Sequence, residues 1–92
     1  MFGPGKAELL SLIAETGSIA AAGRRLGMSY KRAWVLVDTM NTTFAEPLVA
    51  RSRGGASHGG ANLTKTGMRV LALYRNIEAE ARATCAADLQ QM

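Results

Sequence analysis

The sequence has one cysteine, Cys85, and one histidine, His58, among its 92 residues. A single thiol cannot form a disulfide within the chain, and two such ligands are too few for a structural zinc site. The chain also does not open with the charged, apolar and small-residue segments of a signal peptide. A reducing, cytoplasmic location is therefore expected.

Long apolar runs are missing as well, because charged residues or glycine interrupt every such stretch well before about 18 residues. We expect no membrane span. Paired carboxylates, a Ser-His-Asp pattern and a phosphate-binding loop are also absent from the sequence. The chain is therefore expected to be no enzyme and to need no cofactor or metal, and its length fits a single domain, 1–92.

Acidic residues are scarce in the middle of the chain. Between Arg24 and Arg69, eight lysines and arginines stand against two acidic residues, a local net charge of +6, whereas the flanks together carry −2. A positive charge concentrated in one region indicates an anionic partner such as nucleic acid.

The spacing of apolar residues predicts a helix over 6–16, which Gly17 ends. Ser18 and Ser29 are suited to cap two further helices, with Gly27 as the turn between them. Two short helices around a glycine turn are typical of a helix-turn-helix, here over 18–41. Gly23 inside the second helix suggests that the two helices cross closely.

The pattern after residue 41 becomes extended, since Glu46-Pro47 disfavours helix. Two short strand candidates bracket a glycine-rich segment and predict a β-hairpin wing over 48–63. Thr64 is suited to cap a long last helix, 65–89. The predicted fold is mainly α with a small β-hairpin: a winged helix-turn-helix with a long C-terminal dimerisation helix.

One string of residues is specific: Gly-Met-Ser-Tyr-Lys-Arg-Ala-Trp at 27–34, followed by Leu48-Val49, glycine pairs at 54–55 and 59–60, and Leu63-Thr64. With the rest of 15–41, it resembles the N-terminal DNA-binding domain of ModE-type molybdenum-responsive bacterial regulators and, more loosely, the LysR-type winged helix. The resemblance covers about residues 6–82. It implies a dimeric transcription factor whose first and last helices form the interface. Such regulators also carry C-terminal molybdate-binding domains, for which this chain has no residues, so molybdate binding is not expected in it.

Residues at the start of a recognition helix enter the major groove first. Arg32 is suited to a bidentate contact with guanine, Lys31 to a phosphate, and the amide and hydroxyl of Ser18 to a phosphate. Trp34 lies on the rim of its helix, where packing against the wing is favoured and contact with DNA remains the alternative. The predicted DNA-binding residues are Ser18, Ser29, Tyr30, Lys31, Arg32, Trp34, Arg51, Arg53 and Lys65.

The last helix outreaches a body of this size, so its apolar stripe favours a partner subunit. The predicted dimer-interface residues are Leu9, Ile13, Val70, Leu73, Tyr74, Ile77, Ala81 and Cys85. The leading hypothesis is a transcriptional regulator that binds double-stranded DNA as a homodimer on an inverted repeat. The alternative is a protein-interaction module that dimerises with a full-length regulator and modulates it.

Overall fold

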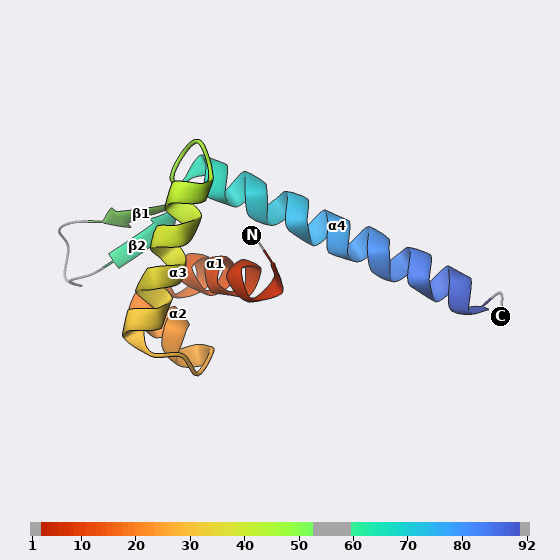
Figure 1. Ribbon diagram of the computed structural model, residues 1–92, viewed down its shortest axis with the longest axis horizontal. Helices are drawn as coiled ribbons and strands as arrows, with labels where there is room; N and C mark the ends of the chain where they lie inside the picture. Colours follow the sequence, from red (N-terminus) through yellow and green to blue (C-terminus); the bar gives the residue numbers. More distant parts are fainter. Residues whose placement is uncertain (1–2, 53–59, 91–92) are drawn as a thin grey trace.

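A computed structural model describes residues 3–52 and 60–90 of the chain. Three helices form the body, a two-stranded antiparallel hairpin lies at one side, and a long helix projects from the other (Figure 1). The elements are α1 (Pro4–Thr16), α2 (Ile19–Arg25), α3 (Tyr30–Thr43), β1 (Val49–Ser52), β2 (Gly60–Leu63) and α4 (Lys65–Gln90). The expected winged helix-turn-helix fold with a long last helix is confirmed.

Two glycines and two serines set the boundaries of the helix-turn-helix. Gly17 and Gly27 both have φ of 70°, the left-handed conformation that glycine adopts without steric cost. Ser18 Oγ accepts a hydrogen bond from the Ala21 amide at 3.1 Å, and Ser29 Oγ accepts one from the Arg32 amide at 3.1 Å. Each serine thus satisfies a donor that the start of its helix leaves unpaired.

Helices α2 and α3 cross closely at Gly23. A Cβ added to this buried glycine would lie 3.0 Å from the Cβ of Ala33, and the Met28 amide donates to the Gly23 carbonyl at 3.0 Å. Glycine costs about 1 kcal/mol in a helix relative to alanine, and the close approach explains why the chain accepts that cost here.

The wing is attached to the body through strand β2. Its register pairs Val49 with Leu63 and Ser52 with Gly60. The Ala61 amide donates to the Gly17 carbonyl at 2.9 Å, next to an isolated bridge between Ser18 and Gly60. Strand β2 is therefore attached to the start of α2.

Helix α4 begins on the same scaffold. Thr64 Oγ1 accepts from the Gly67 amide at 2.9 Å, and the Thr64 amide donates to the Leu48 carbonyl at 3.0 Å. Gly67 lies directly against that carbonyl. Further along, Arg75 donates to Glu78 at 3.1 Å and to Glu8 of α1 at 3.3 Å. These contacts, that with Glu78 foremost, raise the pKa of the Arg75 guanidinium.

The core lies where α1, α2, α3 and the wing meet. Its largest fully buried side chains are Leu9, Leu10, Ile13, Val37, Met40 and Leu48. The expectation that Leu9 and Ile13 face a partner subunit is wrong, because each is 0% exposed within its own subunit. An apolar stripe at helical spacing is the same sequence signal whether it faces a core or an interface.

Three helix boundaries differ from the prediction, the smallest difference being the end of α4 at Gln90 rather than at residue 89. Helix α1 begins at Pro4 rather than at residue 6, because proline is well suited to the first helical turn, where its missing N–H has no intrahelical acceptor. Helix α3 continues to Thr43 rather than ending at Asn41. The helix stops at Phe44, whose backbone is extended.

Candidate nucleic-acid interface

The first turn of α3 presents three neighbouring polar side chains to solvent. Tyr30, Lys31 and Arg32 are all exposed, and the cap at Ser29 fixes the start of the helix beneath them. Within residues 3–52 and 60–90, neither Lys31 nor Arg32 forms an ion pair. Both charges are thus available to a bound anion.

Burial fixes the rotation of α3 against the body. Ala33, Val37 and Met40 face the core, so the side of the helix that carries Lys31 points away from it. A helix held by one buried face with its N-terminal turn exposed has the form that enters a major groove in helix-turn-helix proteins.

The wing contributes a second cation beside this helix. Side chains alternate along a strand, so Val49 and Arg51 share a face of β1. Val49 is buried in the core. Arg51, in contrast, lies over the ring of Trp34, with its guanidinium carbon 4.6 Å from the ring centroid. The Trp34 and Tyr30 rings meet edge to face, with centroids 6.1 Å apart. The structure thus brings Tyr30, Trp34 and Arg51 together in one row.

Trp34 is half-buried, and its contact with Arg51 is the packing against the wing that its place on the helix rim suggested. The Trp34 ring therefore supports the Arg51 guanidinium and is only partly exposed to solvent.

Two predicted residues stand apart from this row. The Ser18 amide already donates to Thr16 Oγ1 at 3.2 Å, so of the two groups expected to meet a phosphate only the Ser18 hydroxyl remains. Lys65 is exposed, but it lies near the far end of α3, because its neighbours Thr64 and Thr66 bond to Leu48 and Glu46. About 20 Å of helix separates that end from Tyr30. Arg53 and His58 lie outside the described residues.

Within the described part of the chain, two cations outside α3, Arg25 and Arg75, form ion pairs, unlike Lys31 and Arg32. Arg25 pairs with Glu15 at 3.0 Å, and both side chains are more than half exposed, so the pair contributes little stability. Arg75 is engaged with Glu8 and Glu78. None of these pairs involves a cation of α3.

Sequence reasoning missed the residue that joins α3 to the wing. Asn41 Oδ1 accepts from the amides of Leu48 at 2.9 Å and Val49 at 3.1 Å, and its Nδ2 donates to the Val49 carbonyl at 3.1 Å. An asparagine near a helix end followed by a strand is a weak signal, because the side chain also suits a simple helix end. The three bonds fix the angle between the recognition helix and β1.

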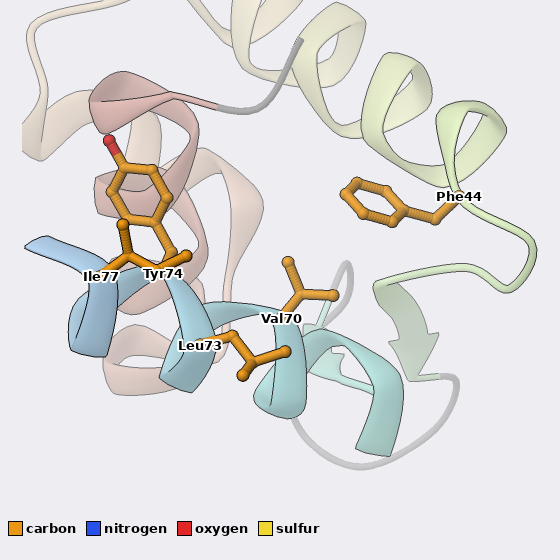
Figure 2. A pocket seen from close by; sticks show the side chains of 5 residues that line it. All are labelled: Phe44, Val70, Leu73, Tyr74 and Ile77. Atoms are coloured by element: carbon orange, nitrogen blue, oxygen red, sulfur yellow. The ribbon is translucent and has the colours of Figure 1, made fainter.

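The predicted interface residues of α4 fall into two groups. Val70, Leu73, Tyr74 and Ile77 line an apolar hollow of about 240 Å³ together with Phe44, which follows α3 (Figure 2). Leu73 and Ile77 are 56% and 63% exposed. Ala81 and Cys85, further out, are exposed in the single chain. The hollow is thus an apolar surface between α4 and Phe44 that the single chain covers only in part.

Two features typical of other classes of protein are absent from the residues that the structure describes. None of their helices is long and apolar enough to cross a membrane. Nor do these residues bring together three His, Cys, Asp or Glu side chains that could hold a metal ion.

Comparison with known sequences gives a family match and several relatives. The profile of the bacterial regulatory helix-turn-helix protein, lysR family, matches residues 6–68. Molybdenum-pterin-binding protein MopB of Rhodobacter capsulatus is 47% identical over 77 residues, 84% of this chain and 28% of that protein. The DNA-binding transcriptional dual regulator ModE of Escherichia coli K12 is 42% identical over 71 residues, 77% of this chain and 27% of that protein. The chain spans little more than a quarter of these relatives' length.

Solved structures share the fold. The crystal structure of the CbnR_DBD-DNA complex matches with a TM-score of 0.72 and 25% identity over 96% of this chain and 97% of that one. Full-length LysG of Corynebacterium glutamicum with bound effector Arg matches with a TM-score of 0.70 and 20% identity, over 99% of this chain and 30% of that one.

Proposed function

Because the chain belongs to the lysR family of bacterial regulatory helix-turn-helix proteins, we propose that it binds double-stranded DNA sequence-specifically and regulates transcription. Helix α3 enters the major groove, and the wing lies on the adjacent backbone or minor groove. The observation that carries the proposal is the row of Tyr30, Trp34 and Arg51, which joins the exposed start of α3 to a wing cation. The same row leaves Lys31 and Arg32 exposed beside it.

The cations have different tasks in this proposal. Arg32 offers two parallel donors to O6 and N7 of a guanine, whereas Lys31 is a point charge for a phosphate. Arg51 follows the backbone beside the groove, where the Trp34 ring holds its guanidinium. The hydroxyls of Ser18 and Ser29 are further phosphate contacts.

The proposal includes a homodimer formed through α4. About 39 Å of helix, from Lys65 to Gln90, projects from the body of a molecule measuring 55 × 28 × 21 Å (Figure 1). Its exposed Leu73 and Ile77 border the apolar hollow, and covering them removes apolar surface from water. A two-fold dimer reads an inverted repeat whose half-sites are spaced by about 34 Å or a multiple of it.

The proposed regulator acts in the cytoplasm, where bacterial DNA lies. The name of MopB refers to molybdenum-pterin binding. We do not propose this property for the chain, because the matched stretch is 28% of the length of MopB.

The apolar face of α4 also supports the second candidate function, pairing with a longer regulator. Light scattering, which gives the oligomeric state, and duplex selection, which gives the sequence preference, together separate the two candidates. A homodimer that selects one palindrome supports DNA binding by this chain, whereas a monomer without duplex preference supports the interaction module.

Selection of duplexes from a random pool at a fixed salt concentration tests the proposal. We expect the full chain to enrich one inverted repeat. Arg32→Ala should relax the preference at one base pair by about 1 to 3 kcal/mol, whereas Lys31→Ala should weaken all duplexes about equally and lower the salt slope by about 1. Failure to enrich any sequence would overturn the proposal.

A further inference from the structure

An exposed valine lies at the centre of the polar surface of α3. Val35 is 54% exposed, although the surface around it carries cations. Single exposed apolar side chains are ordinary on protein surfaces, so exposure alone assigns nothing to Val35. Its position on the helix is what singles it out.

Helical geometry places Val35 opposite the core. At about 100° per residue, it lies about 160° around the axis from both buried residues, Ala33 and Val37. It is therefore among the side chains that point most directly outward from α3. Lys31 and Arg32 precede it by one turn on the same side.

Its surroundings mark the end of the cationic part of the helix. Asp38 lies about one turn further along the helix, and its negative charge repels phosphate. The hydroxyls of Thr39 and Thr42 donate to the carbonyls of Val35 at 2.8 Å and Asp38 at 3.1 Å, so they have no proton left for a phosphate. The cationic part of α3 is thus its first two turns, and Val35 is the last outward-pointing residue in it.

The chemistry of the side chain narrows what it can read. Valine has neither a donor nor an acceptor for a base edge or a phosphate, and the one apolar group in the major groove of unmodified DNA is the C5 methyl of thymine. Resting on the proposed function, we infer that Val35 is a specificity-determining residue that contacts one thymine methyl in each half-site.

Replacing thymine by uracil removes only that methyl and leaves base pairing intact. The test uses the duplex selected by the full chain and a series in which each thymine is replaced singly by deoxyuridine. For the wild-type chain, we expect one thymine in each half-site whose replacement weakens binding about four-fold, which corresponds to about 0.8 kcal/mol at 1.4 kcal/mol per tenfold. Val35→Ala should bind thymine and uracil at that position equally.

Met68→Ala is the matched control, because Met68 is a similarly exposed apolar residue, 55%, on α4 rather than α3. It should keep the wild-type uracil profile. Unchanged thermal unfolding of Val35→Ala would show that its altered profile does not come from misfolding.

The outcomes separate this inference from the function on which it rests. A wild-type chain that selects no duplex overturns the proposed function and this inference with it. A chain that selects a duplex while Val35→Ala keeps the wild-type uracil profile overturns only the inference. The inference is also overturned if no replacement of a thymine by deoxyuridine weakens binding of the wild-type chain.

Discussion

The guanidinium carbon of Arg51 lies 4.6 Å from the centroid of the Trp34 ring, which links the wing to the recognition helix. An arginine over an aromatic face is attracted by about 0.5 to 1 kcal/mol at an exposed site. The contact also limits the orientations of a long, otherwise mobile side chain. Arg51 is therefore preorganised, and less entropy is lost when it meets a phosphate.

The first prediction concerns this contact. Trp34→Ala should weaken binding of the selected duplex about two- to five-fold beyond any effect on folding, because Arg51 loses its support. Trp34→Phe keeps an aromatic face and should restore most of the affinity. Dissociation constants for Trp34→Ala, Arg51→Ala and the double variant complete the cycle. Strictly additive effects on binding would contradict the positioning role of Trp34.

The second prediction concerns Asn41, which makes three hydrogen bonds to the start of the wing. Asn41→Ala leaves the amides of Leu48 and Val49 without their acceptor, and Leu48 is fully buried. We expect a loss of about 1 to 3 kcal/mol in the free energy of unfolding, measured by urea denaturation.

Thr42→Ala is the control for Asn41, because the exposed Thr42 hydroxyl bonds only within its own helix. This variant should change the free energy of unfolding by less than about 0.5 kcal/mol. Equal stabilities of the two variants would show that the Asn41 bonds do not hold the wing.

The third prediction compares two glycines near helix starts. A Cβ at Gly67 would overlap the carbonyl oxygen of Leu48, a backbone atom that cannot simply rotate away. Gly67→Ala should therefore lower the free energy of unfolding by 1 to 3 kcal/mol or more, about the cost of overpacking. Thermal or urea unfolding measures the change.

Gly5→Ala in α1 is the matched control, since an added Cβ there meets nothing within 4 Å. It should stabilise the chain slightly, by up to about 1 kcal/mol, because alanine has the higher helix propensity. A Gly67→Ala variant as stable as Gly5→Ala would contradict the close packing of α4 against Leu48.

The fourth prediction concerns the apolar face of α4. Leu73→Glu should weaken the proposed homodimer at least ten-fold, because dimerisation would bury an unpaired carboxylate at the hollow. Ala79→Glu, at an exposed α4 position about opposite the stripe, should leave the dimer intact. Sedimentation equilibrium measures both. Identical dissociation constants would place the interface elsewhere.

Local chemistry made the helix-turn-helix predictable from the sequence. Gly17 and Gly27 have the left-handed conformation that ends a helix, and Ser29 is the cap that starts the next one. Such signals act within a few residues, so they survive without knowledge of the tertiary structure. The small residue Gly23 likewise predicted the close crossing of α2 and α3.

Features that depend on distant contacts were not predictable in the same way. The helical spacing of Leu9 and Ile13 predicts a dimer interface, but the core formed by other elements covers both residues. The role of Asn41 depends on where β1 lies, and the constraint on Gly67 depends on the backbone of Leu48. The sequence suggested that Trp34 packs on the wing, but not that Arg51 is the residue it contacts.

Competition between two duplexes tests the central claim most directly. The full chain is titrated at 0.15 M salt, a roughly physiological concentration, with its selected inverted repeat and with a scrambled duplex of the same length and composition. We predict binding to the selected duplex at least about 10³-fold tighter, the lower end for specific DNA-binding proteins. Equal dissociation constants for the two duplexes would contradict sequence-specific recognition by α3 and the wing.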